Sequence, residues 1–220
     1  MNGNGAVPFA AERFAMVEQQ LRRRGIQDER LLAAMYKVPR HEFVARQNWA
    51  EAYADHPVPI GEQQTTSQPY MIAAMIQAAQ IKPEDRVLEI GAGSGYQTAL
   101  LAELASQVFA MERYASLADA AGKTLERFGY RNVKIIAGDG SLGWPEAAPF
   151  DAIIVSAAAP RIPPALTEQL APGGRLVVPV GDSQQQVVQL AERDQQGNLS
   201  VRTLEGCRFV PLIGQQGFAA

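Results

Sequence analysis

Residues 87–96 read VLEIGAGSGY, a short apolar run followed by three glycines at alternate positions, Gly91, Gly93 and Gly95. The run predicts a buried strand, and helical periodicity follows over residues 96–104. So tight a connection needs glycine conformations, and backbone without side chains lets a ligand approach the amides at the helix start. The glycines could also serve only close packing of helix on strand. Their spacing differs from the dinucleotide fingerprint, which would place a third glycine where this chain has tyrosine.

Apolar runs and stretches of helical periodicity alternate after this segment. The predicted strands lie at 86–90, 107–111, 133–137 and 151–156, and the predicted helices at 96–104 and 117–128. Strands that alternate with helices of this length imply right-handed crossovers and a parallel sheet.

The last third of the chain has a different pattern. Its predicted strands lie at 175–180, 186–191 and 200–204, and the turn sequence at 194–198 indicates a hairpin. The predicted fold class is therefore α/β, a doubly wound, mostly parallel, Rossmann-like sheet with an antiparallel carboxy-terminal edge and amino-terminal helices.

The amino-terminal part contains two predicted helices and a long connection. Apolar residues at helical spacing predict a first helix between residues 14 and 25. Asp28 is placed as the N-cap of a second helix, which Pro39 stops. Residues 40–68 have no regular pattern, so we expect a long ordered loop there. Pro69 then begins a third helix, because its missing amide hydrogen costs nothing in a first turn.

The composition excludes several classes of protein. Of 220 residues, 47% are hydrophobic and 20% charged, which is enough to fill a core. A net charge of −3 argues against nucleic-acid binding through bulk charge. The chain has no membrane-length apolar run or signal-peptide pattern, and its one cysteine cannot form an internal disulfide. We therefore expect no membrane contact, no metal site and a cytoplasmic location.

Acidic residues follow two predicted strands, at the edge where a parallel sheet binds ligands. Glu112 comes about 20 residues after the glycine loop, where a carboxylate can accept hydrogen bonds from ribose hydroxyls. It could instead be a solvated partner of Arg113. Asp139 can accept from an exocyclic amine while the Gly140 amide meets a ring nitrogen, or the two could only form a turn. With the glycine loop, these residues predict an adenosine pocket.

Several segments resemble the motifs of class I S-adenosylmethionine-dependent methyltransferases: 87–96, 111–113, 138–140, 150–155 and 170–176. Three further segments, at 38–43, 64–71 and 208–212, point to one family within this class. With them, nearly the whole chain resembles the protein-L-isoaspartate O-methyltransferases. The resemblance implies a protein-repair enzyme that transfers the methyl group of S-adenosylmethionine to the free carboxylate of an isoaspartyl residue. It implies damaged peptides and proteins as partners, no metal, no nucleic acid, and a monomer.

The resemblance also assigns roles to residues. It implies Ser67 as the active-site serine and Thr66, Ser67 and Val210 as substrate contacts. Around the methyl donor it implies Glu89, Gly91, Ala92, Gly93, Gly95, Glu112, Arg113, Asp139 and Gly140, with Glu89 placed for the methionyl ammonium. The implied organisation is a flexible tail at 1–12, helices and a substrate-side loop at 13–68, and a methyltransferase core with its hairpin at 69–214.

This chemistry asks little of the protein. A carboxylate is already ionised near neutral pH, so no general base is required, and alignment can supply up to roughly 7 to 11 kcal/mol. Ser67 also suits a helix N-cap, worth about 1 kcal/mol, and the two roles can coexist. Cys207 fits a strand core better than a nucleophile. Two alternatives stay open, a class I methyltransferase acting on RNA or a small molecule, and a non-catalytic nucleoside-binding module.

Overall fold

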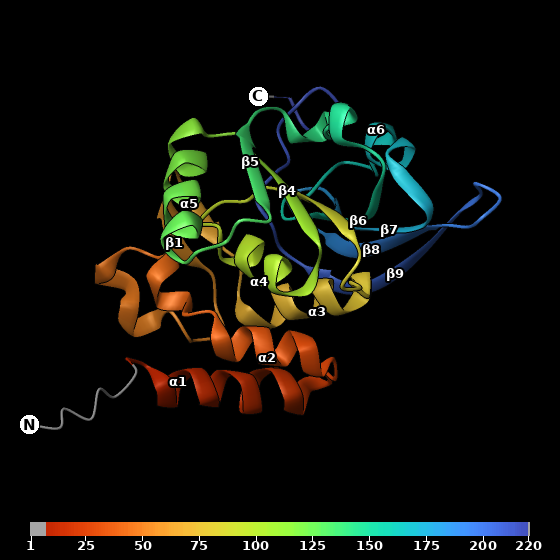
Figure 1. Cartoon of the computed structure of the whole chain (residues 1–220). Helices are drawn as coiled ribbons and strands as arrows, with labels where there is room; N and C mark the ends of the chain where they lie inside the picture. The colour runs from red at the N-terminus through yellow and green to blue at the C-terminus, as the bar shows by residue number, and fades with distance from the viewer. Residues whose placement is uncertain (1–7, 220) are drawn as a thin grey trace, which may run out of the picture.

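The structure, a computed structural model, describes residues 8–219 and is built on a seven-stranded sheet of order β5-β4-β3-β6-β7-β8-β9 (Figure 1). The strands are β3 (Arg86–Ile90), β4 (Gln107–Glu112), β5 (Val133–Ala137), β6 (Phe150–Val155), β7 (Leu170–Gly181), β8 (Gln186–Arg193) and β9 (Leu199–Cys207). The first five pair in parallel, and β8 and β9 add an antiparallel edge. The predicted fold class is confirmed.

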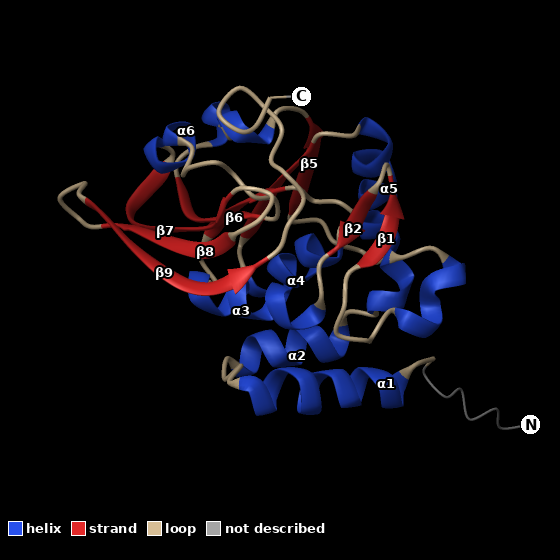
Figure 2. Ribbon diagram, turned by 180° about the vertical axis from the view of Figure 1, so that it is seen from behind, coloured by secondary structure: helices blue, strands red, loops and turns tan. Residues whose placement is uncertain are grey.

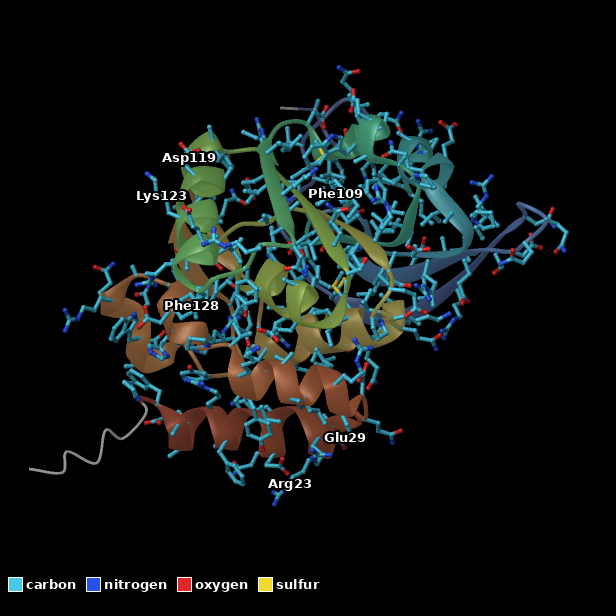
Figure 3. All side chains as sticks on the ribbon, viewed as in Figure 1. Arg23, Glu29, Phe109, Asp119, Lys123 and Phe128 are labelled. Atoms are coloured by element: carbon cyan, nitrogen blue, oxygen red, sulfur yellow. The ribbon has the colours of Figure 1, made fainter. Side chains whose placement is uncertain are left out.

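Side chains of the central strands alternate between two buried clusters, one on each face of the sheet. On β3, Val87 packs in the cluster that contains α3 (Pro69–Ala79) and α4 (Tyr96–Leu104), whereas Leu88 packs in the other. Phe109 lies inside this second cluster, while Asp119 and Lys123 point outward from α5 (Ala115–Arg127) (Figure 3). Burial on both faces explains why consecutive residues of the central strands are apolar, such as residues 108–111 and 152–155.

The amino-terminal helices pack against α3 and α4 (Figure 1). The first begins as α1 (Ala10–Ala15), continues to Arg24 through one π-helical and one 3-10 segment, and ends at Gly25. In α2 (Glu29–Lys37), the Asp28 carboxylate accepts from two amides of the first turn, which confirms the predicted N-cap. Because α1 begins at Ala10, the tail predicted for 1–12 is too long. Its residues 1–7 lie outside the described part of the chain.

The stretch predicted as a loop at 40–68 contains regular structure. Two 3-10 helices, Arg40–Phe43 and Arg46–Glu51, precede an antiparallel hairpin of β1 (Val58–Gly61) and β2 (Gln64–Thr66). Each element is too short to show a periodicity in the sequence. Figure 2 shows the hairpin beside the segment that follows β9.

Other elements differ from the predictions mainly in extent. The strand predicted at 175–180 starts at residue 170, and the short helix α6 (Pro164–Glu168) was not predicted. Cys207, expected in a strand core, is the last residue of the edge strand β9 and is only half-buried, because β9 has one neighbouring strand. Within residues 8–219, no helix has both the length and the apolar character needed to cross a membrane.

The start of α3 is capped by a residue that is distant in sequence. Pro69 occupies the first turn, as predicted, and the N-cap position belongs to Gln68. The Tyr70 amide donates to Oδ1 of Asp55 over 3.1 Å. Among the described residues, the Ser67 hydroxyl accepts from no helix amide, so the N-cap interpretation of Ser67 is wrong.

Replacing Asp55 with Ala should lower the free energy of unfolding by about 1 kcal/mol, since the Tyr70 amide loses its acceptor. Ser67→Ala should leave that free energy nearly unchanged. Urea unfolding followed by circular dichroism measures both. Asp55 also pairs with Arg24, so Arg24→Ala is the matched control. Equal losses in the Asp55 and Ser67 variants would contradict this assignment of the cap.

Candidate active site

The carboxyl ends of β3, β4 and β6 border a cavity of about 320 Å³. It lies at β3, where the strand order reverses, which is where open α/β sheets bind ligands. Its walls come from the glycine loop, the residues after β4, the β1–β2 hairpin and the segment 210–213. Segments that are far apart in the sequence therefore close the cavity over the strand ends.

The three glycines of the loop have different surroundings. Gly91 and Gly93 line the cavity with φ angles of 86° and 52°. A Cβ on Gly95 would lie 3.1 Å from the Cβ of Ala121, so this glycine lets α4 pack against α5. Ala92 lines a smaller cavity beside the first. Two of the glycines thus border the cavity, and the third has the packing role that the sequence left open.

Glu112 ends β4 with its carboxylate in the cavity and only 6% of the residue exposed. Oε2 accepts from the Gly93 amide over 2.8 Å, and Oε1 accepts from the Tyr114 amide over 3.0 Å. Glu112 makes no ion pair with Arg113 in the described chain, although Arg113 also lines the cavity. The carboxylate thus ties the strand end to the glycine loop, and the solvated-partner interpretation is wrong.

Asp139 and Gly140 lie on opposite sides of one turn. Gly140 lines the cavity, and a Cβ there would come 2.4 Å from Cγ2 of Ile90, so only glycine fits. The Asp139 carboxylate accepts from the amide and hydroxyl of Ser141 and from the Gln215 amide. Burial alone would raise the pKa of Asp139, but these hydrogen bonds lower it overall. Asp139 lines an outer cavity with the carboxy-terminal segment and does not line the first.

Glu89 is fully buried beneath the glycine loop. Its Oε1 accepts from Gln97 Nε2 over 2.9 Å, and its Oε2 accepts from the Thr98 hydroxyl over 2.6 Å. Burial raises the pKa of Glu89 to about 8 against the opposing effect of these two hydrogen bonds, and the charge of Glu112 raises it further. A nearby cation would favour the ionised form of this carboxyl.

A second cavity, of about 550 Å³, adjoins the first. Ser67 and residues 206–210 both line it, so Ser67 and Val210 border the same space. A small cavity of about 40 Å³ lies between the two, and Thr65 and Ser156 line all three. The two larger cavities therefore meet at a junction flanked by Thr65 and Ser156.

A buried guanidinium fixes the backbone at Ser67. Arg40 is fully buried, with its Nη2 donating to the Ser67 carbonyl over 2.7 Å and its Nε to the Ala52 carbonyl over 2.7 Å. Its Nη1 donates to the Thr66 hydroxyl over 3.3 Å, and its plane lies over the Tyr96 ring. Thr66 is thus turned toward Arg40 and lines only the smallest cavity.

The two residues that line all three cavities, Thr65 and Ser156, are among the cavity residues that were not predicted. Thr65 precedes Thr66 on β2, so strand alternation turns its side chain to the opposite face. That signal becomes readable only once the hairpin is recognised. Ser156 directly follows β6, and the rule that placed Glu112 at a strand end applies equally to it.

Groups that could supply metal or thiolate chemistry do not gather at the site. No three His, Cys, Asp or Glu residues within 8–219 are arranged to hold a metal ion. Burial, followed by the charge of Glu205, raises the pKa of Cys207 to about 11, so its thiol stays protonated near neutral pH. Cys207 contributes to the wall of the second cavity as a small apolar group.

A doubly wound sheet, a glycine loop tied to a strand-end acid and a cavity at the point of strand reversal are features of class I S-adenosylmethionine-dependent methyltransferases. Residues 11–217 also match the model of the family described as Protein-L-isoaspartate(D-aspartate) O-methyltransferase. The chain therefore belongs to the protein-L-isoaspartate O-methyltransferase family.

Similar proteins agree over nearly the full length. A protein-L-isoaspartate O-methyltransferase from Koribacter versatilis is 54% identical over 211 residues, covering 96% of this chain and 95% of that protein. One from Geobacter metallireducens is 51% identical over 210 residues, covering 96% of this chain and 97% of that protein. A Plasmodium falciparum crystal structure of this family, in complex with S-adenosyl-L-homocysteine, has a TM-score of 0.78 at 27% identity and covers 90% and 97%.

Membership in this family establishes the activity. The chain uses S-adenosylmethionine to methylate isoaspartyl residues of damaged proteins, the first step of their repair. The two alternatives left open by the sequence, an RNA or small-molecule methyltransferase and a non-catalytic module, are disfavoured.

The buried Glu89 carboxyl predicts a pH-dependent stability. The folded protein keeps a proton there up to a pKa of about 8, whereas the unfolded chain loses it near 4.5. The stability from this group is fully present below pH 4.5 and is lost as the pH rises to about 8. Glu89→Gln should remove that loss. Between about pH 5 and 8.5, the free energy of unfolding of the variant should therefore rise relative to that of the wild type, by on the order of a few kcal/mol. Urea unfolding at several pH values measures the difference. A difference that does not change with pH would show that Glu89 is ionised in the folded protein.

Proposed function

We propose that the first cavity binds S-adenosylmethionine and the second binds the isoaspartyl side chain, so that the methyl group passes at their junction. The observation that supports this is the shared wall, since Thr65, Ser156 and Val210 line both cavities. S-adenosylmethionine supplies a methyl carbon on a sulfonium, which an ionised carboxylate can attack directly. Orienting the carboxylate and excluding water then remain for the chain.

The residues of the first cavity fit such a molecule. Each Glu112 oxygen accepts one amide hydrogen bond and keeps a lone pair for a ribose hydroxyl. Gly140 presents bare backbone to an adenine ring. Glu89 has no cationic partner in the described chain. The methionyl ammonium can therefore compensate the charge of Glu89, acting through Gln97 or a water molecule. We assign the methionyl contacts to the backbone of residues 91–93.

The remaining predicted contacts take supporting roles in this proposal. Arg113 borders the nucleoside side of the first cavity, and Gly95 acts through the position of α4. Asp139 already accepts three hydrogen bonds, so an adenine amine would have to add to these. Thr66 acts through Arg40, because its hydroxyl is turned away from the larger cavities.

Ser67 is the proposed donor to the substrate carboxylate. Its backbone is held by Arg40, and in the part of the chain that the structure describes its hydroxyl has no hydrogen-bond partner. The hydroxyl is therefore available to a ligand in the second cavity, opposite Val210. Residues 13–68 then form the substrate side of the enzyme, and residues 69–214 its methyl-donor core.

Two matched peptides, one isoaspartyl and one aspartyl, test the proposal. Purified protein with labelled S-adenosylmethionine should form a base-labile methyl ester on the isoaspartyl peptide alone. S-adenosylhomocysteine binding without ester on either peptide would contradict it. Label in RNA or in a small molecule would point to another acceptor.

Glu112→Ala should weaken S-adenosylhomocysteine binding by about 1.5 to 3 kcal/mol, the range for a hydrogen bond to a charged group. Titration calorimetry measures the affinity, and circular dichroism checks that the variant is folded. Glu112→Gln, which keeps an oxygen acceptor, should lose less. Unchanged affinity in the alanine variant would show that the ribose is held elsewhere.

Ser67→Ala should lower kcat/KM for the isoaspartyl peptide about tenfold or more, while S-adenosylhomocysteine affinity and melting temperature stay the same. The reason is that the hydroxyl meets the acceptor and not the nucleoside. Asp55→Ala, which removes the cap of α3, is the control for an indirect effect of stability. Full turnover in Ser67→Ala would remove Ser67 from the reaction.

We also propose that the chain acts as a cytoplasmic monomer without a nucleic-acid partner. Its single cysteine suits a reducing compartment, and its net charge of −3 disfavours nucleic acid. The most exposed large apolar side chains of the described residues are distributed over four elements or their ends: Phe14, Phe128, Ile136, Leu199 and Val201. Sedimentation analysis, cell fractionation and a nucleic-acid binding assay test the three parts.

A further inference from the structure

We propose that Ser156 is a second substrate-positioning residue, whose hydroxyl donates a hydrogen bond to the isoaspartyl carboxylate at the junction of the two cavities. This inference rests on the proposed function and adds a contact from a second element that lines the same cavity as Ser67. Ser156 lies on the sheet itself, at the end of β6, whereas Ser67 lies in the segment after the hairpin.

The position of Ser156 is fixed by the sheet. Its amide donates to the Ile90 carbonyl over 2.8 Å, which continues the pairing of β6 with β3 beyond the last strand residue. A Cβ on Gly91 would lie 3.5 Å from the Cβ of Ser156, so the serine packs directly against the glycine loop. A group bound at Ser156 is therefore held at a defined place relative to the methyl-donor cavity.

The hydrogen bonds around Ser156 leave its proton free. Gln97 Nε2 donates to the Ser156 oxygen over 2.9 Å and to Glu89 Oε1 over 2.9 Å. Gln97 is nearly buried, and a nitrogen facing a carboxylate and a hydroxyl oxygen acts as the donor to both. Because the serine oxygen already accepts, its own O–H is available to a ligand. The neighbouring space is the junction, since Ser156 lines all three cavities.

A neutral hydroxyl suits this position chemically. The attacking carboxylate loses negative charge as the new O–CH₃ bond forms, so a cationic partner would stabilise the ground state more than the transition state. A hydroxyl orients the oxygen with a smaller ground-state stabilisation. Ser67 and Ser156, on two different elements, can each take one carboxylate oxygen and so fix the plane of the group.

Steady-state methylation of an isoaspartyl peptide by Ser156→Ala, Ser156→Thr and Ser156→Cys tests the inference. Ser156→Ala should lower kcat/KM about tenfold or more, with S-adenosylhomocysteine affinity within about twofold of wild type. Ser156→Thr, which keeps the hydroxyl, should recover most of the activity. Ser156→Cys keeps the size with a weak donor and carries the test if the alanine variant does not fold.

A double-mutant cycle adds a readout that a purely structural role would not give. If both hydroxyls hold one carboxylate, the losses in Ser67→Ala and Ser156→Ala should be non-additive. Wild-type rates in both Ser156→Ala and Ser156→Cys, or a fall in S-adenosylhomocysteine affinity as large as the fall in activity, would overturn the inference. A wild-type protein that forms no ester would instead overturn the proposed function, so the two failures are distinguishable.

Discussion

The parallel pairing of β3 with β4 on one side and β6 on the other is the constraint on which the site depends. It brings three strand ends to one edge, and each end contributes to the wall of the first cavity: the glycine loop after β3, Glu112 on β4 and Ser156 after β6. Hydrogen bonds then join these ends to each other, from Gly93 to Glu112 and from Ser156 to Ile90. The cavity follows from the strand order.

The amino-terminal segments that border the second cavity are organised by a different interaction, the burial of Arg40. One guanidinium donates to two carbonyls and a hydroxyl on separate segments, so the 3-10 helix of residue 40, Ala52 and the start of α3 are held together. Burying a cation is costly unless its hydrogen bonds are satisfied, and here each named nitrogen has an acceptor. The segments around Arg40 thus have their own framework, which meets the sheet at the junction of the two cavities.

The sequence predicted the parallel core well and the hairpin poorly. Strands β3 and β5 and helix α4 have the predicted bounds, because apolar runs, helical periodicity and glycine stops are local signals. The β1–β2 hairpin escaped prediction because its strands are four and three residues long and carry few apolar residues. Because the hairpin was not predicted, Thr65 was not identified as a residue of the cavity wall. The capping of α3 by Asp55 could not be predicted from the sequence either, because the tertiary fold brings together two residues that are fifteen positions apart.

The separation of Asp55 from Ser67 bears on how this site can evolve. A serine that both capped a helix and bound substrate would be under two selective pressures, because its replacement would lower the stability of the protein by about 1 kcal/mol as well as change the substrate contact. Here the cap belongs to Asp55, so a change of side chain at Ser67 removes no hydrogen bond from the start of α3. Variation at the cavity wall is therefore separated from the stability of the helix that follows it.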